Sequence, residues 1–250
     1  MQTEIPSPLF LEQCDSTNRE LWRLLDAGND LNEGFAIQAG FQTAGRGQRS
    51  TSWISEAGKN LLCSVLVKPQ FLPPAKQFLI NKCLALAIRE TLSQIDTLHD
   101  FTIKWPNDIY AENKKVAGTL IENRIMGNTL ELCVAGIGIN INQQSFPPEI
   151  PNPSSLAMLN QKEYNTRECL ESLLESIMKH YSLLKQNQVE SIDQAYLNHL
   201  LGYKKEMNYM SQGKVFRACI QGVNEHGKLI LVDEKNNTRE FGLKEVEFLL

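Results

Sequence analysis

Three strand-forming segments follow one another in the middle of the chain, and the very short connection between the last two constrains the fold more than any other feature. Residues 101–105, 116–125 and 129–141 are rich in apolar and β-branched side chains, and Gly127-Asn128 joins the last two. A two-residue turn of this kind favours a hairpin, in which neighbouring strands run antiparallel. We therefore expect a sheet that is mainly antiparallel.

The first helix is expected close to the N-terminus. Ser16 or Thr17 can begin it, and the spacing of Thr17 and Glu20 matches a capping box. Gly28 is the residue type that commonly ends a helix.

Other segments complete the predicted α+β class. Apolar side chains recur at helical spacing in residues 74–94, 166–186 and 189–201. Further strands are expected at residues 35–42 and 60–67. The predicted fold is therefore a mixed, mainly antiparallel sheet backed by helices.

After residue 204 the pattern changes to short strands at close spacing. These strands are expected at residues 207–211, 214–221, 228–232 and 238–243. A small β-barrel-like unit fits this pattern. We therefore expect two domains, residues 1–203 and residues 204–250.

Composition excludes several classes of function. The chain has 250 residues and a formal net charge of -4, so it lacks the overall positive field that attracts nucleic acid. The N-terminal segment has no signal-peptide pattern, and no apolar stretch approaches the length of a membrane span. We therefore expect a cytoplasmic protein that binds neither nucleic acid nor membrane. The six cysteines lack a C-x-x-C pair and the four histidines do not cluster, which indicates neither a zinc site nor a disulfide framework.

A polar turn with a second lysine nearby follows the first of the central strands. Lys104 ends that strand, and Asn107 and Asp108 follow a proline. If residues 116–121 return beside it, Lys104 and Lys115 would face one pocket from neighbouring strands. Two ammonium groups beside amide and carboxylate groups suit a polyanion, with Asp108 as a metal ligand. The alternative is a solvated charged hairpin with a buried tryptophan.

A loop between two expected strands combines glycine, arginine and hydroxyl residues. Backbone N–H groups of residues 45–47 and the side chains of Arg46 and Arg49 can surround phosphate oxygens. Trp53, at the end of this loop, can stack on a flat group such as a purine. These features suit a closing lid. The alternative is a flexible polar connection with Trp53 in the core.

Two glycines, Gly136 and Gly138, occupy alternate positions of an expected strand. A ligand could therefore lie directly against the backbone there, and a β-bulge is the alternative. The absence of a third glycine and of a following helix excludes a dinucleotide-binding fingerprint.

Taken together, these segments form five motifs in a fixed order. They are residues 16–18 (Ser-Thr-Asn), 42–47, 104–108, 115–118 and 136–140. Their order and spacing resemble the biotin protein ligase family, and the resemblance extends from Phe10 to Leu250. It implies a catalytic domain like that of class II synthetases, followed by a small SH3-like barrel.

The resemblance also implies a two-step reaction. Family members condense biotin with ATP to biotinyl-5'-adenylate and pyrophosphate. They then transfer the biotinyl group to one lysine of an acceptor such as the biotin carboxyl carrier protein. Because negative charge builds up on phosphate oxygens, such an enzyme needs converging cations and Mg²⁺ rather than a protein nucleophile.

The matched motif positions carry the site residues that the resemblance implies. The catalytic residues are Lys115, Arg46 and Lys104. The biotin side is assigned to Ser16, Thr17, Asn18, Gln42, Arg46, Gly47, Gln48, Lys115, Gly118, Gly136 and Gly138. The ATP side is assigned to Arg49, Trp53, Lys104, Asn107, Asp108 and Asn140. Asp108 is either a metal ligand or a support for its loop.

The chain departs from the family pattern in two places. Gln48 stands where an arginine is usual, which affects how tightly the loop holds the acyl-adenylate, and Arg49 compensates in part. The helix-turn-helix that precedes the catalytic motifs in some members has no counterpart, so we expect a short form without repressor activity. In the C-terminal unit, Lys244 is either a phosphate contact or a solvated strand residue.

Two other functions stay open. A lipoate protein ligase shares the fold and the acyl-adenylate chemistry, but its arginine- and glycine-rich pocket motif is missing. A non-catalytic, adenylate-binding regulatory module would account for Gln48, but Lys104, Asp108 and Lys115 are all present. An exposed strand of the central sheet could pair two copies in a homodimer.

Overall fold

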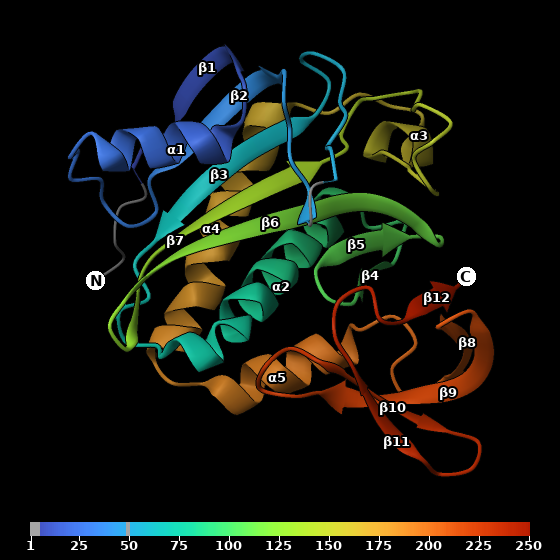
Figure 1. The fold of residues 1–250 in the computed structure, drawn as a ribbon. Helices are drawn as coiled ribbons and strands as arrows, with labels where there is room; N and C mark the ends of the chain where they lie inside the picture. The colour runs from blue at the N-terminus through green and yellow to red at the C-terminus, as the bar shows by residue number, and fades with distance from the viewer. Residues whose placement is uncertain (1–5, 49–50) are drawn as a thin grey trace.

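The computed structural model describes residues 6–48 and 51–250 and contains two β-sheets (Figure 1). The larger sheet has seven strands in the order β1-β2-β3-β7-β6-β5-β4. Its strands are β1 (Leu9–Cys14), β2 (Ala36–Gln42), β3 (Leu61–Val67), β4 (Phe101–Lys104), β5 (Asp108–Ala111), β6 (Lys114–Met126) and β7 (Thr129–Ile139). Strands β1 and β2 are parallel, and every other neighbouring pair is antiparallel. The predicted class, a mixed and mainly antiparallel α+β fold, is confirmed.

One strand that the sequence did not predict separates the two lysines of the central hairpin. Strand β5 pairs with β4, so that Lys104 faces Asp108, and it pairs with β6 on its other side. Lys104 and Lys115 therefore do not lie on neighbouring strands, and that prediction is wrong. The chain reverses at Glu112 and Asn113, which both have positive φ. Asparagine is enriched in this conformation but glutamate rarely adopts it, so the sequence marks the turn only weakly.

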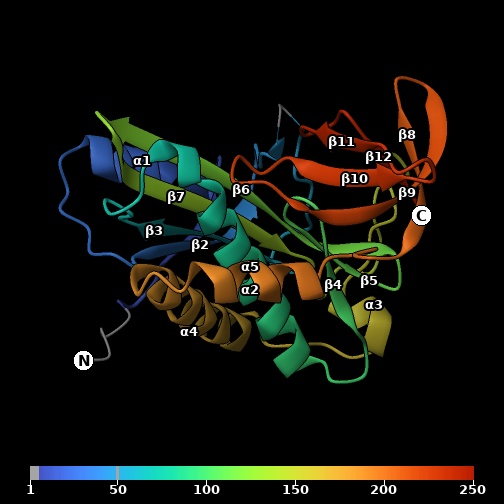
Figure 2. The ribbon, with the colours of Figure 1, turned by 90° about the horizontal axis from the view of Figure 1, so that it is seen from below.

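Helices cover both faces of the seven-stranded sheet (Figures 1 and 2). Helix α1 (Thr17–Asp26) lies on one face, where Leu21 packs with Ile37, Leu66 and Val134 of the sheet. Helices α2 (Phe78–Ile95), α4 (Thr166–Lys185) and α5 (Val189–Asn198) cover the other face and share its apolar core. Along β3, alternate side chains therefore point to different cores.

The starts of two helices differ from the prediction. Ser16 is the N-cap of α1, and no side chain caps the helix end, so the capping box expected at Thr17 is wrong. The Thr17 hydroxyl is instead within 3.2 Å of Oε1 of Gln42. The single long helix expected from residue 74 begins as a 3-10 turn, Pro74–Lys76, before α2. A short helix, α3 (Leu156–Asn160), was not expected.

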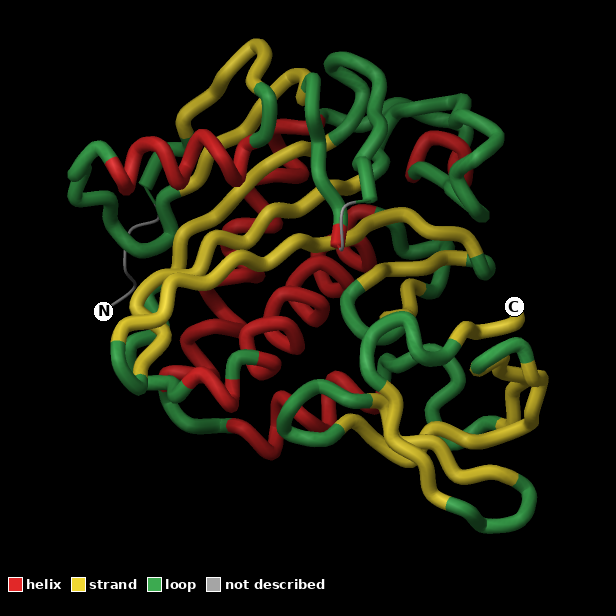
Figure 3. The backbone as a smooth tube through the Cα atoms, viewed as in Figure 1, coloured by secondary structure: helices red, strands yellow, loops and turns green. Residues whose placement is uncertain are grey.

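The second sheet is antiparallel and contains five strands in the order β11-β10-β9-β8-β12 (Figure 3). Its strands are β8 (Glu206–Ser211), β9 (Lys214–Val223), β10 (Leu229–Asp233), β11 (Thr238–Phe241) and β12 (Glu247–Leu249). Four of them match the predicted segments, whereas β12 was not expected. Nε1 of Trp105 donates a buried hydrogen bond of 3.0 Å to the carbonyl oxygen of Gly227. The polar turn after β4 is therefore anchored on the second sheet.

The described part of the chain also bears on disulfides, metal sites and membrane-spanning helices. All six cysteines are free, and most of them are buried. Within residues 6–48 and 51–250, no three His, Cys, Asp or Glu side chains come together as a metal site would require. None of the helices there combines the length and the apolar character that crossing a bilayer demands.

Candidate active site

A cavity of about 520 Å³ lies over strands β6 and β7 and reaches the last strand of the second sheet. Its size falls within the range that small-molecule sites usually occupy, about 300 to 1,000 Å³. The walls come from the start of α1, the loop after β2, the turn after β4, strands β6 and β7, and residues 243–248. Segments that are far apart in the sequence therefore meet around one space.

Most of the predicted site residues line this cavity. They are Ser16, Thr17, Asn18, Gln42, Arg46, Gly47, Gln48, Trp53, Lys104, Asn107, Asp108, Lys115, Gly118, Gly136 and Gly138. Lys244, in the connection between β11 and β12, lines it as well. Arg49 lies outside the described residues.

Asn140 is the one described site residue that does not line the cavity. It is buried, and its side-chain amide donates to the carbonyl oxygen of Ser154 at 2.9 Å. That segment is paired with the start of β6, because the N–H of Ser154 donates to the carbonyl oxygen of Lys115 and the N–H of Lys115 donates to the carbonyl oxygen of Asn152. Asn140 therefore supports the backbone behind Lys115, and its assignment to the ATP side stays a prediction.

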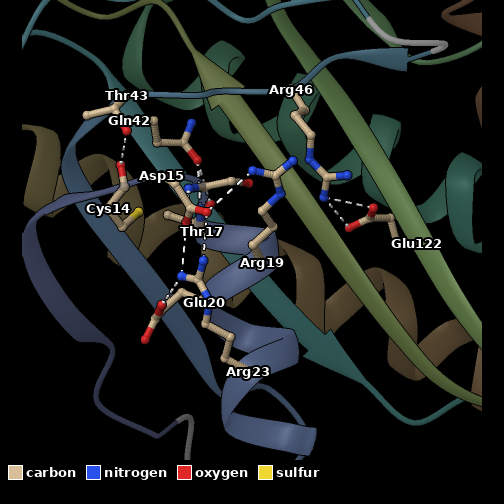
Figure 4. Close-up of polar contacts among 11 residues, drawn as sticks. Cys14, Asp15, Thr17, Arg19, Glu20, Arg23, Gln42, Thr43, Arg46 and Glu122 are labelled. Carbon is tan, nitrogen blue, oxygen red and sulfur yellow. Dashed lines mark hydrogen bonds and ion pairs between the residues drawn. The ribbon is translucent and has the colours of Figure 1, made fainter.

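A neutral polar cluster forms one side of the cavity. Two of its members, Thr17 and Gln42, are drawn in Figure 4. Oε1 of Gln42 accepts a hydrogen bond from the backbone N–H of Thr17 at 2.8 Å. The buried hydroxyl of Ser64 lies 2.7 Å from Oγ1 of Thr17 and 2.6 Å from Oδ1 of Asn18. These groups hold one another in place, which prepares a surface of donors and acceptors for an uncharged polar ligand.

Asp15 fixes the backbone just before this cluster. Its carboxylate accepts from the N–H of Ser16 at 2.8 Å and from Arg23 at 2.7 Å (Figure 4). The Arg23 hydrogen bond is the main cause that holds the pKa of Asp15 below its usual range, and the Ser16 N–H acts in the same direction. Backbone N–H groups of Thr43 and Ala44 bond to Cys14 and Asp15, so the loop after β2 is tied to the start of α1.

The two glycines of β7 allow side chains to approach its backbone closely. A Cβ at position 136 would lie 2.4 Å from Oδ1 of Asn18, and one at position 138 would lie 2.4 Å from Cε2 of Trp53. The strand pairs in regular register on both sides there, so the β-bulge alternative is wrong. Glycine is needed at these positions because the floor of the cavity is bare backbone.

The loop after β2 has a defined fold where it is described. Arg46 and Ser52 form an isolated antiparallel bridge, and the N–H of Trp53 donates to the carbonyl oxygen of Gly45 at 3.0 Å. The Trp53 ring lies over the cavity floor at Gly138, and its Nε1 has no partner among the described residues. These contacts argue against a plain flexible connection.

Lys104 lies between two aromatic rings. Its Nζ is 5.0 Å from the ring centroid of Tyr110 and 5.5 Å from that of Phe248, which belongs to the second sheet. Burial lowers the pKa of the Lys104 ammonium below its ordinary value, and the charge of Lys115 acts in the same direction. Asp108 and Glu247 oppose this shift. The residue is therefore a partly desolvated cation, which binds an anion more strongly than a solvated one.

Lys115 pairs with Asp108 across the cavity wall. The distance between Nζ of Lys115 and Oδ1 of Asp108 is 2.7 Å, and the Lys115 ammonium lies 5.6 Å from the Trp53 ring centroid. Asp108 thus has a structural partner, whereas its Oδ2 accepts no hydrogen bond from the described residues. Both roles considered for Asp108 are compatible with this arrangement.

The turn that carries Asn107 and Asp108 is braced from behind. The carbonyl oxygen of Pro106 accepts from Oη of Tyr196 at 2.8 Å and from Nδ2 of Asn81 at 3.2 Å. Nδ2 of Asn107 donates to the carbonyl oxygen of Thr119 at 2.8 Å. Trp105 is buried, as the structural alternative expected, but the turn around it lines the cavity rather than forming a solvated hairpin.

Four residues beside the site were not identified from the sequence. They are Ser64, Tyr110, Glu122 and Phe248. Three of them reach it through long-range contacts, and Tyr110, six positions from Lys104, lies on the strand that was not expected. Ser64 is a single polar residue in an otherwise apolar strand, and this pattern would have identified it. Glu122 is followed directly by Asn123 and Arg124 in β6, so no such pattern distinguishes it.

A sequence profile of the Biotin/lipoate A/B protein ligase family matches residues 10–140, which contain all five motifs. This chain belongs to that family. The family expected from the motifs is thereby confirmed.

Relatives and solved structures of this ligase family extend the match to the remaining chain. The bifunctional ligase/repressor BirA of Bacillus spizizenii is 28% identical over 226 residues, which cover 89% of this chain and 68% of the relative. A biotin--[acetyl-CoA-carboxylase] ligase of Mycobacterium tuberculosis is 29% identical over 149 residues, covering 59% of this chain and 53% of the relative. The solved structure of a biotin protein ligase from Aquifex aeolicus in complex with biotin and ATP has a TM-score of 0.78 and 26% identity, covering 96% of this chain and 97% of that one.

Proposed function

We propose that this member of the ligase family is a biotin protein ligase. It would activate biotin with ATP to biotinyl-5'-AMP and then pass the biotinyl group to a lysine of a biotin carboxyl carrier protein. The observation that carries the proposal is one cavity in which a neutral polar cluster meets the cations of Arg46, Lys104 and Lys115. Biotin has the matching chemistry, because its ureido head is neutral and polar and its tail ends in a carboxylate.

The first step needs cations because two anions must meet. A carboxylate oxygen of biotin attacks the α-phosphorus of ATP, a new C–O–P linkage forms, and pyrophosphate leaves with the electron pair of the broken P–O bond. We assign Lys115 to the reacting oxygens, and Lys104 and Arg46 to the phosphates. Fixed cations in a partly desolvated cavity stabilise the charge that develops there.

The second step needs no nucleophile from this chain. The amine of the acceptor lysine attacks the acyl carbon, an amide bond forms, and AMP leaves. Cys63 borders the cavity, but burial raises the pKa of its thiol to about 12. Because a protonated thiol is a poor nucleophile, Cys63 does not compete as an acyl carrier.

Mg²⁺ is part of the proposal, with Asp108 as its protein ligand. Magnesium is commonly held by one or two carboxylates together with substrate phosphates. Asp108 lines the cavity, and pairing with Lys115 engages Oδ1 and leaves Oδ2 for a cation. The metal would neutralise charge on the leaving pyrophosphate.

The remaining parts of the proposal concern organisation. Residues 1–203 would form the catalytic domain, and residues 204–250 a second domain that closes the cavity with Phe248 and Lys244. A homodimer would use the outer edge of β1, the end strand of the larger sheet. The cytoplasmic location expected from the sequence stays a prediction.

Exchange of labelled pyrophosphate into ATP tests the proposal directly. We expect exchange with biotin, and none with lipoate or without an added acid. Exchange with lipoate alone would identify a lipoate protein ligase. Binding of a biotinyl-adenylate analogue without any exchange would identify a non-catalytic module. Transfer is then tested by adding a carrier domain and measuring by mass spectrometry whether its lysine gains a biotinyl group.

A further inference from the structure

Glu122 lies outside the five motifs, yet its carboxylate joins two of them. It is a residue of β6 and pairs in register with Val134 of β7. One carboxylate oxygen accepts from Nδ2 of Asn18 at 2.8 Å. Both oxygens accept from Nη2 of Arg46, at 2.9 Å and 3.1 Å (Figure 4). A single side chain thus contacts the start of α1 and the loop after β2.

This contact determines which way the Asn18 amide faces. A carboxylate only accepts hydrogen bonds, so the NH₂ group of Asn18 must point toward Glu122 and toward the carbonyl oxygen of Leu120. Oδ1 then points to Ser64 and to the bare backbone at Gly136. Asn18 is almost fully buried, at 2% exposure, so an amide that faced the other way would lose these partners.

The same carboxylate fixes the direction of the Arg46 guanidinium. Glu122 takes up only Nη2, whereas Nε of Arg46 is buried and has no partner among the described residues. Arg46 also lines the cavity. A buried N–H donor such as Nε of Arg46 is normally hydrogen-bonded, and an anionic ligand in the cavity would supply the acceptor. Glu122 therefore secures one end of the guanidinium and leaves other donors available.

We propose that Glu122 is a positioning residue that orients Asn18 and Arg46 together, and so prepares the biotin side and the loop for binding at the same time. The inference rests on the proposed function for the identity of the ligand. The Glu122–Arg46 and Glu122–Asn18 contacts are made between residues of this chain. The effect of Glu122 on Asn18 and its effect on Arg46 can therefore be tested separately.

The test uses the full chain with Glu122→Gln, which keeps the shape of the side chain and removes its charge. The matched control is Asp26→Asn, which removes the ion pair to Arg124, two residues further along the same strand and outside the cavity. Biotin affinity is measured by calorimetry without ATP, and loop exposure by the rate of trypsin cleavage after Arg46 in the ligand-free protein.

For Glu122→Gln we expect the Kd for biotin to rise about tenfold, because a hydrogen bond to a charged group is stronger than one to a neutral group. Cleavage after Arg46 should become severalfold faster. The Asp26→Asn control should match the wild type in both measurements. If the role of Glu122 were purely structural, Glu122→Gln would lower the melting temperature. The biotin affinity of the folded protein and the rate of cleavage after Arg46 would then stay unchanged.

Wild-type values in both measurements for Glu122→Gln would overturn the proposal, as would equal changes in Asp26→Asn. Glu122→Asp is the second variant if Glu122→Gln does not fold. It keeps the charge on a shorter side chain, and smaller changes in the same direction are expected, whereas wild-type values overturn the proposal. A wild-type protein that does not bind biotin would refute the proposed function, and the cleavage comparison would still decide the role of Glu122.

Discussion

Lys115 and Asp108 form an ion pair of 2.7 Å at the edge of the cavity floor. The glycine at position 118 makes room for it, because a Cβ there would lie 2.9 Å from Oδ1 of Asp108 and 3.1 Å from Nζ of Lys115. The Trp53 ring limits the lysine from another side. The ammonium is therefore held in place by residues of this chain. A charge that is already fixed can stabilise a transition state without reorganisation.

Lys115→Ala should nearly abolish adenylate formation and leave the fold intact. Loss of a charge-stabilising donor typically lowers a rate about 10²- to 10³-fold. The ion pair is partly exposed, and such pairs contribute only about 0 to 1 kcal/mol, so the melting temperature should stay close to the wild-type value. Biotin-dependent pyrophosphate exchange and thermal unfolding measure the two effects.

The neighbouring Lys114 provides the control for this prediction. It is exposed on the same strand and does not line the cavity. Lys114→Ala should retain wild-type exchange. If Lys115→Ala also retained near-normal exchange, the assignment of Lys115 to the reacting oxygens would be wrong.

Lys104 should give the activity an alkaline limit at a lower pH than an exposed lysine would. Burial lowers the pKa of its ammonium below the ordinary value of 10.5, so the charged form is lost earlier as the pH rises. The KM for ATP should increase on this side because the phosphates lose a cation. Tyr110 does not account for such a limit, since burial raises the pKa of its hydroxyl to about 12.

Lys104→Arg distinguishes this cause from others. Arginine stays charged throughout the accessible pH range, so the alkaline increase in the KM for ATP should disappear or move to higher pH. The measurement is the KM for ATP between pH 7 and pH 10 in both proteins. An unchanged profile in Lys104→Arg would assign the limit to another group.

The motifs predicted most of the cavity because each is a short contiguous segment at the end of a strand or helix. The positions of Lys104 and Lys115 near one pocket followed from the strand pattern, although the strand between them was missed. Strand β5 has only four residues, which is too short for alternation to be distinctive.

What the sequence did not predict depends on contacts between distant segments. Phe248 reaches Lys104 only because the second sheet folds back on the turn after β4. Strand β1 was missed because it lies at the sheet edge, where most of its side chains are exposed and its hydrophobic pattern is weak. Glu122 lies in a polar stretch of β6 with Asn123 and Arg124, so its sequence context does not single it out, and only the folded structure shows that Asn18 and Arg46 meet there.

Gln48→Arg should slow the escape of the proposed adenylate. Gln48 lines the cavity with a neutral amide, and an arginine there would add a charged donor for the phosphate. We expect about a tenfold slower release, since charge-assisted hydrogen bonds are roughly twice as strong as neutral ones. Release is measured by chasing labelled adenylate with excess unlabelled biotin. Gln48→Ala should stay near the wild-type rate, and equal slowing in both variants would show that charge is not the cause.

Gly136→Ala should reduce biotin affinity at least tenfold, because the new Cβ would lie 2.4 Å from Oδ1 of Asn18 and force that side chain to move. Overpacking of this kind typically costs about 1 to 3 kcal/mol, so the melting temperature should also fall. Gly222→Ala is the control, since Gly222 is also a strand glycine but has no atom within 4 Å of its would-be Cβ. It should keep wild-type affinity and stability. Calorimetric titration with biotin gives the affinities, and unchanged binding by Gly136→Ala would show that Asn18 can leave its position without affecting the ligand.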